Sequence, residues 1–180
     1  NPIAELGALV KDSDTLYLVD SVAGLGGVDV RVDEWGIDAF YSGSQKCLST
    51  PPGLAPASFS EAAMEAMARR KTKVPNWYLD VKLLEQYWTG EHDYHHTAPV
   101  NMNLGLHEGL RLLANEGLEQ SWARHRQNAE RFWAGLEQLG LELFVPPALR
   151  LTTLTTICVP NNIACSAWKS HLLRNFGVQI

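Results

Sequence analysis

Two residues of the sequence have side-chain types and positions that could support chemistry on a small molecule. Asp20 ends a short apolar run at residues 15–20, and Lys46 follows the next such run, at residues 37–42. Short apolar runs rich in β-formers are typical of strands buried on both faces of a sheet. In an open α/β sheet, ligands bind outside the carboxyl ends of the strands, so both side chains are expected to face one crevice.

A carboxylate and an amine that share such a crevice suit the chemistry of pyridoxal 5'-phosphate (PLP). PLP needs a lysine amine for its Schiff base, and a carboxylate beside the pyridine nitrogen keeps the ring protonated and electron-withdrawing. Lysine suits the first role because a desolvated ammonium group readily loses its proton. Each residue also has an ordinary alternative: Asp20 as a turn or cap residue, and Lys46 as a solvated surface group.

The elements around these residues follow the pattern of an α/β protein. A Gly-rich turn at residues 23–27 follows the first strand, and a third strand is expected at residues 54–59. Apolar residues at three- and four-residue steps predict helices, with a break at Gly117 and a C-cap at Gly140. The other expected elements are helices at 61–70, 81–87, 101–139 and from Ala164, and strands at 141–145, 152–159 and 177–180.

This order predicts an α/β fold with a mostly parallel sheet, followed by the start of a small α+β region. We place the boundary at Glu116, so that residues 1–116 belong to the sheet domain. Residues 117–180 would form a connecting helix and an incomplete small domain. Because the chain starts at Asn1 without Met and stops within an apparent strand, we expect it to be a fragment of a longer protein.

Four separated motifs, in order along the chain, resemble the class V aminotransferases, which have the PLP-transferase fold of type I. They are residues 19–23 (VDSVA), 41–46 (YSGSQK), 51–53 (PPG) and 94–99 (YHHTAP). Within that family they look most like the alanine–glyoxylate and serine–pyruvate aminotransferases. The resemblance implies that residues 1–116 are the C-terminal half of the PLP-binding large domain, in a central-to-C-terminal piece of the enzyme.

The resemblance implies a role for each matching residue near the first two motifs. Lys46 would carry PLP as the internal aldimine and, once displaced by substrate, shuttle a proton between the substrate Cα and the cofactor C4′. Asp20 would pair with the pyridinium nitrogen, and Val22 would pack on one face of the ring. Gln45 would contribute to the phosphate or nearby cofactor contacts. Lys46 and Asp20 are therefore the catalytic candidates.

Further positions imply how the site is shared and which reaction it performs. Tyr94 and Thr97 match positions that reach the cofactor phosphate of the neighbouring subunit, so a homodimer with shared active sites is implied. The implied reaction moves an amino group from alanine or serine to glyoxylate or pyruvate. The family's arginine for the substrate carboxylate has no match here, since Arg150 lies at a different position. Because complete enzymes of this kind are roughly twice as long, we expect the isolated chain to be inactive.

Other interpretations of the same sequence remain open. A phosphonate-pathway aminotransferase or a cysteine desulfurase would share the class V pattern, although the desulfurases usually have a histidine at the position of Gln45. A non-catalytic module that kept the fold is a further alternative. A nicotinamide-dependent oxidoreductase rests only on the turn at residues 24–27, which lacks the third glycine of a dinucleotide fingerprint. A tight turn with close backbone packing is expected there instead.

Histidines, cysteines and net charge limit the partners that are expected. His95 and His96 are adjacent and should point in different directions, with no third ligand at useful spacing, so no metal is expected. Cys47, Cys158 and Cys165 form no C-x-x-C pair, which favours a reducing compartment without choosing among cytoplasm, peroxisome and mitochondrion. The net charge of −5 and the absence of an 18-residue apolar run predict no nucleic-acid or membrane partner.

Overall fold

The computed structural model describes residues 2–89 and 94–180. It divides into two compact units, Asn1–Trp122 and Ala123–Ile180. A compact unit is not by itself an independently folding domain, so the domain boundary expected at Glu116 stays a prediction. No helix among the described residues is long and apolar enough to cross a membrane.

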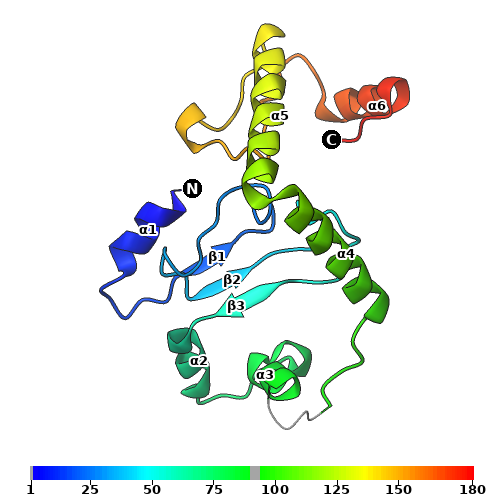
Figure 1. Cartoon of the computed structure of the whole chain (residues 1–180). Coiled ribbons are helices and arrows are strands. Elements are labelled where there is room, and N and C mark those ends of the chain that lie inside the picture. Colours follow the sequence, from blue (N-terminus) through cyan, green and yellow to red (C-terminus); the bar gives the residue numbers. More distant parts are fainter. Residues whose placement is uncertain (1, 90–93) are drawn as a thin grey trace. The chain divides into compact units, whose positions relative to one another are not determined.

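The first unit is built on a three-stranded sheet in which β1 (Leu18–Asp20), β2 (Ala39–Tyr41) and β3 (Ala57–Phe59) lie side by side (Figure 1). The first two strands are parallel, and β3 runs antiparallel to β2. Backbone pairing continues beyond the named strands, because Ser42 N–H donates to the Pro56 carbonyl at 2.8 Å. The three expected strands are thus present, each shorter than its apolar run.

The two faces of this sheet are covered unequally. Val19 and Phe40, which are neighbours in the parallel register, are buried and form a core with Ile37. The side chains that alternate with them point to the opposite face, as strand geometry requires. On that face Leu18 is 66% exposed and Phe59 is 39% exposed. The described residues therefore bury one face of the sheet and leave apolar side chains on the other.

Helices surround the sheet in the first unit. They are α1 (Ile3–Val10), α2 (Glu61–Ala68), a 3-10 helix (Trp77–Leu79), α3 (Val81–Thr89) and α4 (Val100–Glu116). The start of α2 is fixed by Ser60, whose Oγ accepts from the Ala63 N–H at 3.1 Å and donates to Asp38 Oδ1 at 2.6 Å. The expected helices at 61–70 and 81–87 are confirmed. Sequence reasoning missed α1, which has Pro2 at its N-cap and no capping side chain.

Helix α5 (Leu118–Gln138) begins in the first unit and continues into the second at Ala123. The second unit also contains a 3-10 helix (Pro147–Leu149) and α6 (Cys165–Phe176). The expected break at Gly117 is confirmed, since this residue has φ +89° between α4 and α5. The expectation of strands at 141–145 and 152–159 was wrong: only an isolated bridge joins Leu143 and Ile157. A lone two-stranded pair is marginal without further strands beside it. The strand expected at 177–180 is also not formed.

Candidate active site

The parallel pair β1 and β2 brings the chemistry-bearing residues to one edge of the sheet. Asp20 is the last residue of β1 and is paired in register with Tyr41, the last residue of β2. Lys46 lies in the turn at residues 44–48 that follows β2. The carboxyl ends of two parallel strands point the same way, so the carboxylate and the amine lie at the edge where α/β proteins bind ligands.

Asp20 is held by two hydrogen-bond donors. Its Oδ1 accepts from the Val22 backbone N–H at 2.8 Å, and its Oδ2 accepts from the Tyr41 hydroxyl at 2.8 Å. The hydrogen bond to Asp20, then desolvation and the charge of Asp20, raise the pKa of Tyr41 above its ordinary value. The phenol therefore stays protonated and donates at neutral pH. Each carboxylate oxygen retains a second lone pair that a ligand can use.

Lys46 is presented by a turn that other side chains hold in place. Ser44, which is 1% exposed, donates from Oγ to the Pro51 carbonyl at 2.7 Å and accepts from the Leu54 N–H at 3.3 Å. The Lys46 side chain is exposed, and it makes no hydrogen bond or ion pair within the described residues. A well-anchored loop thus offers an amine that is available to a ligand.

Val22 and Gln45 approach each other beside a glycine. A Cβ placed on Gly43 would lie 2.9 Å from Gln45 Oε1 and 3.5 Å from Val22 Cγ1. The loops that follow β1 and β2 meet again at Cys47, whose thiol lies 3.7 Å from the Ala23 carbonyl. The sequence-predicted residues that share this edge of the sheet are therefore Asp20, Val22, Gln45 and Lys46.

The Gly-rich turn packs against the loop that carries Lys46. A Cβ on Gly26 would lie 3.4 Å from Leu48 Cδ2 and 3.3 Å from Leu113 Cδ2, and Gly26 itself has φ +91°. The Gly26 carbonyl accepts a 2.8 Å hydrogen bond from the fully buried Ser121 hydroxyl. The expectation of a tight turn with close packing is confirmed, and no dinucleotide site is needed to explain these glycines.

Helix α4 also contacts this loop, through a residue that sequence reasoning missed. A Cβ on Gly109 would collide with Thr50 Cγ2 and would lie 2.6 Å from the Leu48 carbonyl oxygen. Only glycine lets the helix backbone come this close to the loop. A glycine inside an apolar helical stripe is the signal that could have indicated such a contact.

Tyr94 and Thr97 form a pair of their own, before α4. Their hydroxyl groups are hydrogen-bonded to each other, and both side chains are exposed. Within the described part of the chain, no hydrogen bond joins this pair to Asp20 or Lys46. The structure therefore gathers the predicted residues into two groups, one at the sheet edge and one on the segment before α4.

His95 anchors the segment that carries this pair. Its ring is 7% exposed and stacks on Trp77 with centroids 4.4 Å apart. His95 Nε2 lies 3.2 Å from the Trp77 carbonyl, and its Nδ1 lies 2.8 Å from His96 Nδ1. The Trp77 carbonyl can only accept, so His95 donates to it from Nε2, and in the neutral tautomer His95 Nδ1 accepts a hydrogen bond from His96 Nδ1. The expectation that the two rings point apart was wrong, because they share a hydrogen bond that residue spacing does not reveal.

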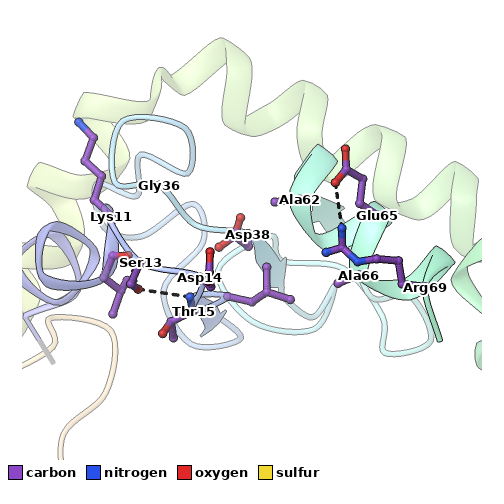
Figure 2. Close-up of a pocket in the computed structure, with 12 residues that line it drawn as sticks. Lys11, Ser13, Asp14, Thr15, Gly36, Asp38, Ala62, Glu65, Ala66 and Arg69 are labelled. Atoms are coloured by element: carbon purple, nitrogen blue, oxygen red, sulfur yellow. Dashed lines mark hydrogen bonds and ion pairs between the residues drawn. The ribbon is translucent and has the colours of Figure 1, made fainter. Parts of the chain in front are cut away.

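Two other features do not belong to the site. A cavity of about 740 Å³ is lined by Thr15 and Asp38 (Figure 2). These residues precede β1 and β2, so the cavity lies at the amino ends of the two strands, opposite the ends that carry Asp20 and Lys46. In the second unit, Arg150 bonds the Val145 carbonyl at 3.0 Å and pairs with Glu137 at 3.3 Å. Among residues 2–89 and 94–180, no group of three His, Cys, Asp or Glu side chains could hold a metal ion.

Comparison with known proteins identifies the family of the chain. The sequence profile of the Aminotransferase class-V family matches residues 1–180. The chain belongs to the class-V aminotransferase family. A class-V member of known structure, alanine–glyoxylate aminotransferase from Nostoc sp., superposes with a TM-score of 0.93 at 47% sequence identity. The match covers 99% of this chain and 47% of the Nostoc chain, and it confirms the expected fold.

Curated class-V relatives give the same assignment. The chain is 45% identical to alanine–glyoxylate aminotransferase of Oryctolagus cuniculus, over 99% of this chain and 47% of that enzyme. It is 34% identical to (S)-ureidoglycine–glyoxylate transaminase of Bacillus subtilis, over 100% of this chain and 48% of that enzyme. The chain thus spans about half the length of the class-V relatives it matches.

Proposed function

We propose that the protein containing this chain is a PLP-dependent aminotransferase that transfers an amino group from an amino acid to a 2-oxo acid. One observation carries the proposal: Asp20 and Lys46 lie at the carboxyl ends of neighbouring parallel strands. Such an edge is where α/β proteins bind their ligands. A carboxylate and an amine there are the two groups that PLP requires of a protein.

The residues at this edge fit the cofactor. Asp20 has no cation bonded to it within the described residues, and both of its oxygens keep a lone pair. The exposed Lys46 amine has no competing partner there. The aliphatic side chain of Val22 is half-buried beside the same loop, where it can cover one face of a planar ring. The site therefore offers a covalent anchor, a counter-charge and an apolar wall.

We assign each residue a role on this basis. Lys46 binds the cofactor covalently and, when the substrate takes its place, moves the proton at the substrate Cα. Asp20 holds the proton at the pyridine nitrogen, and Gln45 contributes to nearby polar contacts of the cofactor. When bound, PLP supplies an electron sink for the negative charge that develops at the substrate Cα.

Tyr94 and Thr97 are proposed to bind the cofactor phosphate of a neighbouring subunit in a homodimer. Their paired hydroxyls are exposed on one segment, and hydroxyl donors of this kind suit phosphate oxygens. This arrangement would place residues of two subunits in each active site.

Among the candidate acceptors, we favour glyoxylate over pyruvate. Relatives from Oryctolagus cuniculus, Nostoc sp. and Bacillus subtilis all have glyoxylate in their names, whereas their amino donors differ. Alanine is favoured over serine as the donor, since the Nostoc and rabbit enzymes are named for alanine and are more similar to this chain than the Bacillus enzyme.

The test is cofactor attachment in the full-length protein. After incubation with PLP and reduction with borohydride, mass spectrometry should find the added cofactor mass on the peptide that contains Lys46. The Lys46→Ala variant should lose this mass and the visible absorbance of lysine-bound PLP, and it should lose transamination of alanine with glyoxylate. The matched control is Lys73→Ala, an exposed lysine outside the site, which should behave as wild type. Attachment to a different lysine would contradict the proposal.

A further inference from the structure

Tyr41 is a residue of the site that the motif assignments leave without a role. It ends β2 and is the register partner of Asp20 across the parallel pair. Register partners project from the same face of a sheet, so the two side chains stand together at its carboxyl edge. The Tyr41 hydroxyl lies 2.8 Å from Asp20 Oδ2.

The hydrogen bond from Tyr41 completes a clamp on the carboxylate. The Val22 backbone N–H fixes Oδ1 at 2.8 Å, and the phenol fixes Oδ2 at the same distance. A carboxylate held at one oxygen can still rotate about its last side-chain bond, because that torsion is broad. With a donor on each oxygen, the plane of the carboxylate is set. Tyr41 supplies the part of the clamp that a mutation can remove without changing the backbone.

The direction of the hydrogen bond follows from the chemistry of the pair. The hydrogen bond to Asp20 contributes most to the raised pKa of Tyr41, followed by desolvation and the negative charge of Asp20. The phenol therefore keeps its proton across the neutral range and acts as the donor. An ionised carboxylate can only accept, so the roles of the two groups are fixed.

We propose that Tyr41 is a positioning residue that orients the Asp20 carboxylate toward the pyridine nitrogen of the cofactor. This inference rests on the proposed function, in which Asp20 holds the proton at that nitrogen. An oriented carboxylate meets its partner without losing rotational freedom on binding, which favours both cofactor affinity and turnover. Tyr41 acts only through Asp20 and needs no contact with the substrate.

The first experiment measures the Tyr41–Asp20 pair without the cofactor. In the full-length apoprotein, the alkaline ultraviolet absorbance of tyrosinate is titrated, and the curve of Tyr41→Phe is subtracted from that of wild type. The difference reports Tyr41, whose titration should lie above that of an ordinary tyrosine. In an Asp20→Asn background the same difference should move to lower pH, because a neutral amide replaces the carboxylate whose hydrogen bond and charge raise the pKa of Tyr41. An unmoved titration would overturn the pairing.

The second experiment measures the consequence for the cofactor. Tyr41→Phe should weaken PLP binding and lower kcat by about three- to tenfold each, the usual effect of losing one hydrogen bond of ordinary strength. The control is Tyr17→Phe, which also removes a phenol hydrogen bond, of 2.9 Å, but to the Ile3 carbonyl. Tyr17→Phe should leave both quantities unchanged within about twofold, since the Tyr17 hydroxyl bonds the Ile3 carbonyl and not Asp20.

The decisive comparison is a double-mutant cycle. If Tyr41 acts through Asp20, Tyr41→Phe should change PLP affinity by less than about twofold when Asp20 is already Asn. Additive effects would overturn the positioning role. Suppose that Asp20→Asn strongly lowers PLP affinity and turnover, while Tyr41→Phe has no more effect than the control Tyr17→Phe. That result would overturn the positioning role of Tyr41 and leave the proposed role of Asp20 intact. An Asp20→Asn variant with normal PLP affinity and turnover would defeat the proposed role of Asp20 as well.

Discussion

At the scale of single residues, the site combines a fixed carboxylate with an amine that is free to move. Asp20 accepts one hydrogen bond on each oxygen, from Val22 and Tyr41. Lys46 has no such restraint within the described residues, but the backbone of its loop is anchored by the buried hydroxyl of Ser44. This division suits the proposed chemistry, because the counter-charge stays in place while the amine has to leave and return.

The loop around Lys46 provides the prediction at this scale. Ser44→Ala should lower the free energy of unfolding by about 1–3 kcal/mol, because it leaves the Pro51 carbonyl and the Leu54 N–H without their partner. It should also weaken PLP binding, because the turn that presents Lys46 loses its anchor. Urea unfolding and PLP titration of the full-length protein measure the two effects.

The control for Ser44→Ala lies in the same loop. Ser49 is exposed, and its Oγ makes only a long contact of 3.5 Å with the Cys47 carbonyl. Ser49→Ala should therefore change the free energy of unfolding by less than about 0.5 kcal/mol. Equal effects of the two substitutions would show that the buried hydroxyl does not anchor the loop.

Residue types predicted part of this site and could not predict the rest. The placement of Asp20 and Lys46 at one sheet edge followed from where each lies relative to an apolar run. The partner of Tyr41 depends on the strand register, which pairs it with Asp20, and no local pattern specifies that register. The hydrogen bond between His95 and His96 was missed for a related reason, since it depends on a stack with the distant Trp77.

At the scale of elements, α4 positions the loop of Lys46 by packing directly on it. The contact is made at Gly109, where the space for a Cβ is taken by Thr50 and the Leu48 carbonyl. Leu48 is itself buried, so the loop lies between the helix and the Gly-rich turn. A disturbance of the helix would therefore reach the site through the loop.

Gly109→Ala is the prediction at this scale. The added methyl group must displace the loop or the helix, so we expect a loss of about 1–3 kcal/mol of unfolding free energy, together with weaker PLP binding. The control is Gly135→Ala in α5, where a Cβ meets nothing within 4 Å in the described structure. There the higher helix propensity of alanine should add up to about 1 kcal/mol. Thermal unfolding of both variants checks the opposite signs; a neutral Gly109→Ala would contradict the packing argument.

Elements with a strong local signal were predictable, and those that depend on neighbours were not. Helix α2 has a Ser60 cap and an apolar face, and both can be seen in the sequence. The segments at 141–145 and 152–159 have strand-like composition, yet they form one bridge, because a strand needs partners on its edges. Helix α1 was missed because it lacks the capping side chain that indicates a helix start.

At the scale of the whole molecule, the exposed face of the sheet predicts how the 180 residues behave alone. Leu18, Ala39 and Phe59 line an open apolar hollow of about 440 Å³ beside Met67. Apolar surface of this kind favours association with other proteins. The chain expressed by itself should bind a hydrophobic dye, form aggregates and show no transamination of alanine with glyoxylate. The full-length protein is the control, and an active, monomeric isolated chain would contradict this expectation.

The proposed sharing of active sites between two subunits can be tested with heterodimers whose two subunits carry different substitutions. In a heterodimer of Lys46→Ala and Tyr94→Phe/Thr97→Ala subunits, one site carries both defects and the other carries neither. Heterodimers isolated through two affinity tags should therefore recover about half of the wild-type activity at limiting PLP, since a symmetric dimer has two equivalent sites. Asp20 and Lys46 lie at one sheet edge of the same chain, so heterodimers of Lys46→Ala and Asp20→Asn should recover nothing. Failure of the first pair to recover would place Tyr94 and Thr97 in the site of their own subunit.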